Sequence, residues 1–219
     1  MMKRILTVLA ALMLLVPSAC AEIVGRAGEE YIHRWDAPNG QALYFVSRET
    51  EPYVVMKDVN FDGVEDVVVT TFVGASNFGA EFFVWDDGDY VPVEHFEADE
   101  IVNYSLHPEL GLVETYIQQG RAGALYTRQL WRWWGNELSL MREAIGSEEE
   151  TWYYEDDLVT VVTDRSHVYL RVRDHYHLTA VDGDWNPTLI MEEVVDLYDE
   201  EALSDALDEA DRIFWQDVW

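Results

Sequence analysis

The chain has 219 residues, of which 49% are hydrophobic and 13% aromatic, and its formal net charge is −29, from 14 Lys and Arg against 43 Asp and Glu. The aromatic and hydrophobic content is enough for a packed core and excludes an intrinsically disordered chain. An acidic protein of this kind repels nucleic acid and anionic membrane surfaces, which excludes both as partners, and attracts cations and basic proteins. The alternative is that the acidity only keeps an exported protein soluble.

Residues 1–20 are predicted to be an export signal. A basic start and the apolar stretch Ile5–Val16 are followed by small residues, and this stretch is too short for a membrane span. Cleavage before Glu22 would release a secreted protein, whereas Ser18–Cys20 resembles the end of a bacterial lipobox, in which Cys20 becomes the lipidated first residue. Cys20 is the only cysteine, so no internal disulfide can form. We expect a cell-envelope lipoprotein or a secreted protein, with a lipid at Cys20 as its only membrane contact.

Residues 21–40 are polar and predict a poorly ordered lead-in, followed by one domain at 41–219. In this domain short runs rich in Val, Tyr, Phe, Trp and Thr alternate with turn signals, as in β-strands. The runs are ALYFVS (42–47), YVVMKDV (53–59), DVVVTTFV (66–73), EFFVW (81–85), YVPVEHF (90–96), GLVETYI (111–117), ALYTRQLWRWW (124–134) and LSLMRE (138–143).

Turn sequences predict how neighbouring runs connect. Asp87-Gly88 and Gly135-Asn136 are dipeptides that form two-residue β-hairpin turns. The segments TWYYEDDLVTVVT (151–163) and SHVYLRVRDHYHL (166–178) look like a further pair of strands. The sequence therefore predicts a mainly β fold built from antiparallel β-hairpins.

The C-terminal segment is predicted to be an amphipathic helix over residues 200–216. Asp199 is a suitable N-cap, and acids occupy the face opposite the apolar stripe. We expect this stripe to dock on the sheet. Its residues, which recur at helical spacing, are Leu203, Ala206, Leu207, Ala210, Ile213 and Phe214.

The acidic nonapeptide DVNFDGVED, residues 58–66, stands directly before a predicted strand. Side chains at alternate positions of a tight loop point inward, and oxygen atoms gathered in this way are the ligands that Ca²⁺ prefers. Without a cation, three carboxylates this close would repel one another. The predicted calcium ligands are Asp58, Asn60, Asp62, the main-chain carbonyl of Val64, and Asp66. Gly63 permits the sharp turn, and Glu65 is expected to point outward. The alternative is an Asx-rich turn without a metal.

The nonapeptide resembles the D-x-[DN]-x-D-G-x-x-D calcium hairpin of integrin-type (FG-GAP/VCBS-like) β-propeller repeats. The order of segments over about 42–143 is similar to a family of bacterial exported proteins and lipoproteins with a single such hairpin. This resemblance implies a propeller-like arrangement of the hairpins and Ca²⁺ at the five positions named above. For some members it implies an immunity function, in which the protein blocks a lysozyme-like, peptidoglycan-cutting effector.

The sequence contains no G-x-S-x-G, H-E-x-x-H or phosphate-binding glycine loop, and its cysteine lies at the processing site. We therefore predict a non-enzymatic binding module that acts outside the cytoplasm, with a protein partner of basic charge in the cell envelope. One alternative is an inhibitor or immunity protein against a cell-wall hydrolase, and the other is an envelope module that binds glycans through exposed aromatic side chains. Strand alternation is expected to bury Trp131 and Trp133 and to leave Trp134 at the turn.

Overall fold

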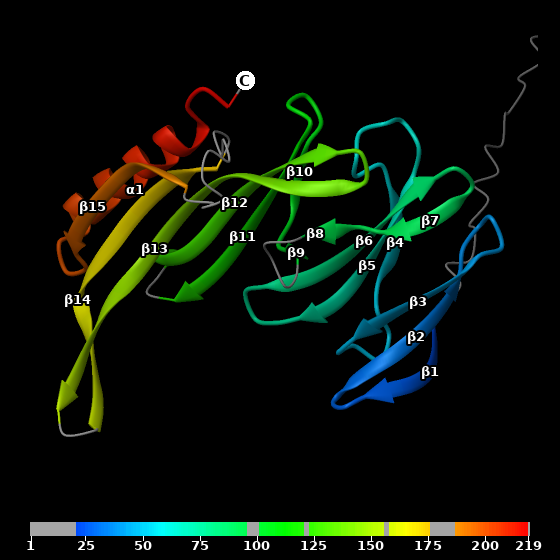
Figure 1. The fold of residues 1–219 in the computed structure, drawn as a ribbon, viewed down its shortest axis with the longest axis horizontal. Coiled ribbons are helices and arrows are strands. Elements are labelled where there is room, and N and C mark those ends of the chain that lie inside the picture. Colours follow the sequence, from blue (N-terminus) through cyan, green and yellow to red (C-terminus); the bar gives the residue numbers. More distant parts are fainter. Residues whose placement is uncertain (1–20, 96–100, 121–122, 156–157, 176–186, 219) are drawn as a thin grey trace, which may run out of the picture.

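The computed structural model describes residues 21–95, 101–120, 123–155, 158–175 and 187–218, and the predicted signal with Cys20 lies outside these ranges. The described residues form three antiparallel sheets and one C-terminal helix (Figure 1). The first sheet has the order β1-β2-β3, with β1 Glu22–Ala27, β2 Glu30–Asp36 and β3 Ala42–Ser47.

The second sheet has the order β4-β5-β6-β7, and the short strand β9 pairs with β6. Its strands are β4 Val54–Lys57, β5 Asp66–Val73, β6 Phe78–Asp86, β7 Asp89–Pro92 and β9 Ile101–Val102. The third sheet runs from β10 to β15 in chain order, and β8 (Glu94–His95) adds a short parallel pair with β13. Its other strands are β10 Ser105–His107, β11 Leu112–Gly120, β12 Leu125–Trp134, β13 Glu137–Glu155, β14 Leu158–Asp174 and β15 Thr188–Asp196.

Three hydrophobic clusters join the successive layers, which follow one another along the long axis of the molecule (Figure 1). The first cluster lies between the first and second sheets, and the second between the second and third sheets. The second sheet is therefore covered on both faces, which explains why Val67, Val68 and Val69 are all buried. A continuous apolar run is typical of a strand with two covered faces.

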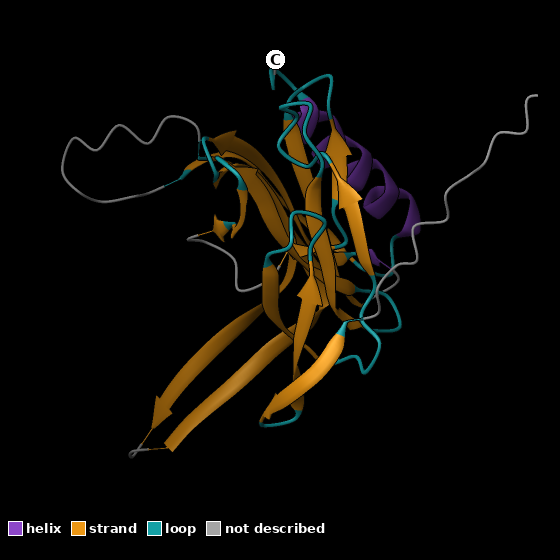
Figure 2. Cartoon of the chain, turned by 90° about the vertical axis from the view of Figure 1, so that its right-hand side faces the viewer, coloured by secondary structure: helices purple, strands orange, loops and turns teal. Residues whose placement is uncertain are grey.

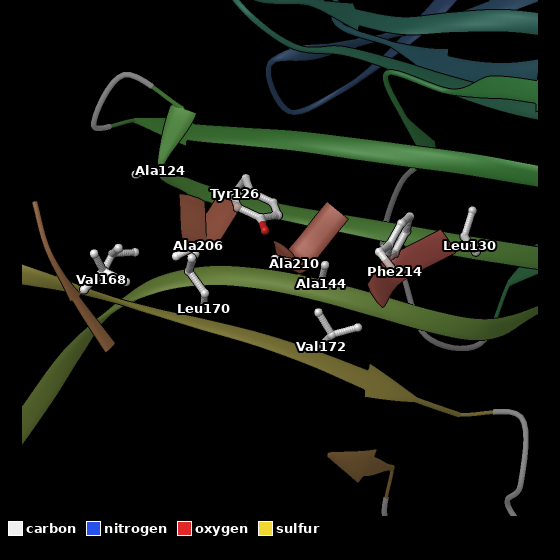
Figure 3. Packing of buried hydrophobic residues seen from close by; sticks show 11 residues of the cluster. Ala124, Tyr126, Leu130, Ala144, Val168, Leu170, Val172, Ala206, Ala210 and Phe214 are labelled. Atoms are coloured by element: carbon white, nitrogen blue, oxygen red, sulfur yellow. The ribbon is translucent and has the colours of Figure 1, made fainter. Parts of the chain in front are cut away.

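Helix α1 (Glu200–Trp215) covers the outer face of the third sheet, as Figure 2 shows from the side. The prediction of this helix is confirmed, including its N-cap, because the Asp199 side chain accepts a hydrogen bond from the Ala202 main-chain nitrogen. Ala206, Ala210 and Phe214 are buried against the sheet (Figure 3). No helix of the described residues is long and apolar enough to span a membrane.

The prediction of a poorly ordered lead-in at 21–40 is wrong, because β1 and β2 occupy most of this segment. His33 and Trp35 of β2 point into the molecule and are only 0% and 8% exposed. Charged residues and glycines separate the apolar residues here, so the segment reads as polar even though one face of β2 is buried.

Most of the other predicted strands are confirmed, and so are the turns at Asp87-Gly88 and Gly135-Asn136, which close the β6–β7 and β12–β13 hairpins. The pairing expected for 151–163 with 166–178 is wrong. Trp152 pairs with Val161 instead, so the strand change falls inside the first of these segments. The paired strands β13 and β14 form a long hairpin that extends beyond the helix-covered part of the sheet (Figure 1).

Candidate metal centre

The acidic nonapeptide forms the loop between β4 and β5, and its first half is fixed on the hydrophobic core. The Val59 side chain is fully buried, and Phe61 packs beside it in the cluster between the second and third sheets. The indole Nε1 of Trp133 donates a hydrogen bond of 2.8 Å to the Val59 carbonyl oxygen. The third sheet therefore holds the loop from outside its own hairpin.

Asp66 is the first residue of β5, and its side chain is fully buried. Its Oδ2 accepts a hydrogen bond from the Val59 main-chain nitrogen at 2.9 Å, and its Oδ1 accepts one from the Trp85 main-chain nitrogen at 2.8 Å. This carboxylate thus joins the start of the loop to β6. Burial raises the pKa of Asp66, and the main-chain donors from Trp85 and Val59 partly oppose that effect.

The other predicted ligands form tight turns within the loop. Asp58 Oδ2 accepts from the Gly63 nitrogen at 3.0 Å, and Asp62 Oδ1 accepts from the Val64 nitrogen at 2.7 Å. Asn60 contacts Asp62 twice, since its Oδ1 accepts from the Asp62 nitrogen at 3.1 Å and its Nδ2 donates to Asp62 Oδ2 at 3.0 Å. Gly63 has a φ of 87°, in the left-handed region that favours glycine.

One oxygen of this loop lacks a partner. Asp58 Oδ1 is buried and makes no hydrogen bond, and a buried carboxylate oxygen without a donor or a cation is costly. Each of the predicted side-chain ligands can offer an oxygen atom to a metal, and oxygen ligands are the set that a hard cation such as Ca²⁺ prefers. Glu65 is exposed, as expected, and so takes no part in the hydrogen bonds around Asp66.

The structure places the five predicted ligands in one loop but does not bring them to one point. In the described part of the chain, no three His, Cys, Asp or Glu side chains are grouped so that they could hold a metal ion. Asp58 Oδ2 and both oxygens of Asp62 and Asp66 accept hydrogen bonds from within the loop or from β6. A bound cation would therefore have to replace some of the hydrogen bonds that Asp58, Asp62 and Asp66 accept.

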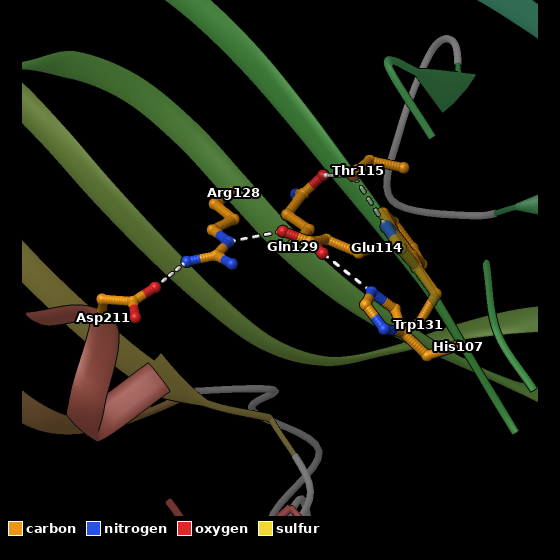
Figure 4. A network of polar contacts seen from close by, with 7 residues as sticks. All are labelled: His107, Glu114, Thr115, Arg128, Gln129, Trp131 and Asp211. Carbon is orange, nitrogen blue, oxygen red and sulfur yellow. Dashed lines mark hydrogen bonds and ion pairs between the residues drawn. The ribbon is translucent and has the colours of Figure 1, made fainter. Parts of the chain in front are cut away.

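A polar network beside α1 was not predicted from the sequence (Figure 4). The Glu114 carboxylate forms a hydrogen bond of 2.8 Å with His107 Nε2 and accepts one of 2.5 Å from Arg128 Nε. Arg128 also donates a hydrogen bond to the Asp211 carboxylate of α1. The Arg128 guanidinium lies 4.5 Å from the centre of the Phe214 ring. Since both oxygens of Glu114 are engaged and the network joins the sheet to the helix, its role is to hold α1 in place. Its link to the helix joins Arg128 and Asp211, which lie 83 positions apart in the sequence.

The expected placement is confirmed for Trp131, which is 2% exposed, and for Trp134 at the turn, which is 65% exposed. Trp133 was expected to be buried but is only partly buried, packed against the cluster that contains Trp131. Other exposed aromatic side chains belong to different parts of the fold, such as Tyr44 on β3 and Tyr198 just before α1. Trp134 is therefore the exposed tryptophan of this hairpin on which a sugar ring could stack.

Comparisons with protein-family models, with curated proteins and with solved structures give no significant match to this chain.

Proposed function

We propose that the protein is an exported, non-enzymatic binding module that binds Ca²⁺ in the loop between β4 and β5. The observation that carries this proposal is the buried Oδ1 of Asp58, which makes no hydrogen bond. It lies in a loop whose other predicted ligands also offer oxygen atoms to a metal. The residues that would hold the ion are Asp58, Asn60, Asp62, the Val64 carbonyl and Asp66. When bound, Ca²⁺ supplies the positive charge that offsets the mutual repulsion of the three carboxylates.

In this proposal the ion stabilises one loop, whereas the hydrophobic clusters stabilise the fold as a whole. Val59 and Asp66 are already fixed by the core and by β6, so the ion is needed mainly by the exposed half around Asp62 and Gly63. Extracellular calcium modules bind with dissociation constants of about 10⁻⁴ to 10⁻³ M. At ~2 mM Ca²⁺ such binding stabilises the folded protein by about 0.6 to 1.8 kcal/mol.

Calorimetric titration with Ca²⁺ tests the metal site directly. We expect one site of millimolar or submillimolar affinity and a melting temperature raised by a few degrees. Asp62→Ala removes a ligand oxygen and should abolish both effects, whereas Glu65→Ala, in the same loop but not a predicted ligand, should retain them. Magnesium should substitute poorly because it requires a small, near-ideal octahedral shell. Absence of binding at millimolar Ca²⁺ would show that the nonapeptide is only an Asx-rich turn.

For the partner, we propose a basic protein of the cell envelope, with inhibition of a cell-wall hydrolase as the activity. Residues 21–219 contain 12 Lys and Arg against 43 Asp and Glu, a formal charge of −31, and charge of one sign speeds association with a partner of opposite sign. The resemblance of the loop also leads us to propose that the three sheets are arranged like propeller blades. A pull-down from the cell-envelope fraction, followed by a hydrolase assay on the captured protein, tests the inhibitor function.

The second candidate is glycan binding, favoured by the 65% exposure of Trp134. Sedimentation with purified peptidoglycan separates the two functions. Retention of the parent protein on peptidoglycan that is lost in the Trp134→Ala variant would support the glycan module. Capture of a basic hydrolase by the parent protein and by the Trp134→Ala variant alike would support the inhibitor.

A further inference from the structure

Strand β15 (Thr188–Asp196) forms one edge of the third sheet, and in the described part of the chain it pairs with β14 alone (Figure 1). Its main-chain N–H and C=O groups on the side away from β14 therefore face no other described strand. At nine residues it is the longest edge strand in the described sheets, since the others have six residues or fewer. A long unpaired edge is a template on which another strand can form.

The side chains of β15 leave this edge open. Leu189, Ile190 and Val194 are apolar and yet 48%, 42% and 49% exposed. The strand contains no proline and no lysine, the residues that most often block an edge. A bulge at Ile190 disturbs its start, but from Met191 to Asp196 the pairing with β14 is regular. These six residues therefore offer a regular edge about 20 Å long.

The charged side chains of β15 are all acidic, namely Glu192, Glu193 and Asp196, and all three are exposed. Val195 is buried against α1. Strand alternation therefore places Glu192, Val194 and Asp196 on the face opposite the helix. On that face the edge presents an apolar side chain between two carboxylates, which favours a partner with an apolar residue between two cations.

The charge of the edge excludes a second copy of this chain as the occupant. A second β15 would bring the same three carboxylates, and like charges opposite one another destabilise a strand pair. Residues 21–219 as a whole have a formal charge of −31, so two copies would also repel each other over a longer range. The occupant that fits is an extended segment of a basic protein.

We propose that β15 binds an extended segment of the basic partner protein, which adds a strand to the third sheet. This inference rests on the proposed function, because it names the surface to which that partner binds. Main-chain hydrogen bonds supply the affinity in this mode of binding, and alternate side chains supply the specificity. Arg171 already donates a hydrogen bond of 2.9 Å to Glu192. The matching segment therefore has lysine or arginine opposite Glu193 and Asp196, and an apolar β-branched residue opposite Val194.

Fluorescence anisotropy at low salt tests the proposal with a labelled, end-blocked peptide, Thr-Lys-Val-Val-Lys-Lys-Thr. We expect saturable one-to-one binding, together with slower amide hydrogen exchange in residues 191–196. The matched control peptide has the same side chains and charge but carries an N-methyl group on each central residue, which removes its main-chain donors. Because charge alone would bind both peptides equally, we expect the control peptide to bind about tenfold more weakly.

Val194→Lys places a cation on the edge and should weaken peptide binding about tenfold. Val73→Lys makes the same change of charge on the second sheet, where Val73 is 64% exposed, and should bind the peptide nearly as the parent protein does. Glu193→Lys on the same strand takes the place of Val194→Lys if that variant fails to fold. Equal binding of the two peptides, equal effects of Val194→Lys and Val73→Lys, or unchanged exchange in residues 191–196 would each overturn the proposal.

The envelope pull-down separates failure of this site from failure of the proposed function. Capture of a basic protein by the parent protein and by Val73→Lys, but not by Val194→Lys, would support the site. Equal capture by all three proteins would place the partner elsewhere, which overturns this inference and leaves the proposed function intact. If the parent protein captures no basic protein but still binds the peptide at β15, the proposed partner is wrong and strand addition at β15 is supported.

Discussion

Glu81 on β6 makes the stability of the protein depend on pH in a direction opposite to that of most carboxylates. It pairs with Val69, which is 0% exposed, and burial raises the pKa of Glu81 from its ordinary 4.5 to about 7. The folded state therefore holds this proton more tightly than the unfolded chain does. Stability from this group is fully present below pH 4.5 and is lost as the pH rises through 7. From 4.5 to about 7, at 1.36 kcal/mol for each pH unit, the loss amounts to about 3 kcal/mol.

Glu81→Gln isolates this effect, because glutamine keeps the shape of the protonated acid and cannot ionise. We expect the variant to be more stable than the parent protein at pH 8 by about 2 to 3 kcal/mol, and by less than about 1 kcal/mol at pH 5. Urea unfolding at both pH values, with calcium fixed, measures the difference. Glu193→Gln, exposed on β15, is the control and should change stability little at either pH. An equal gain for Glu81→Gln at pH 5 and pH 8 would refute the reasoning.

Three further changes test other parts of the molecule. Cys20→Ala should move the protein from the membrane pellet to the soluble fraction if Cys20 carries a lipid, and an unchanged distribution would contradict the anchor. Leu207→Asp places a charge where α1 packs on the sheet, so chemical unfolding should show a loss of several kcal/mol, while Asp208→Ala on the exposed face should change little. Arg142→Met leaves Asp174 and three carbonyl oxygens at the end of α1 without this donor, and should cost about 3 to 5 kcal/mol. A loss below 1 kcal/mol would show that water replaces the guanidinium there.

The elements that the sequence predicts well are those whose signal is local. The run Val67–Val69, the Asp87-Gly88 turn and the apolar stripe of α1 each depend on neighbours within one strand, turn or helix. Strand β15 was missed because nearly all of its residues are exposed and only Val195 is buried. An edge strand covered at so few positions lacks the alternation that reveals a strand.

The order of the sheets could not be predicted, because it depends on contacts between distant segments. The Val59 carbonyl accepts a hydrogen bond from the Trp133 indole, 74 positions away in the sequence. Ser47 Oγ donates to the carbonyl oxygens of Thr70 and Thr71, which lie 23 and 24 positions away. Neither contact has a local pattern. The wrong pairing of 151–163 has a different origin, because the chain reverses locally, between Glu155 and Leu158, inside a continuous β-rich segment that does not show the turn.

The nine residues of the candidate metal centre also combine features that local sequence predicts with a contact that it does not predict. Spacing alone predicts its oxygen ligands, because oxygen-bearing side chains at alternate positions around a glycine are typical of calcium loops. Spacing did not reveal that Asp66 also accepts the main-chain nitrogen of Trp85, which lies 19 positions away on β6. This second role means that substitution of Asp66 would damage the hairpin as well as the proposed metal site. The hydrogen bonds of the Asp62 side chain lie within the loop, so Asp62 is the position at which a loss of the proposed calcium binding can be separated from a loss of the fold.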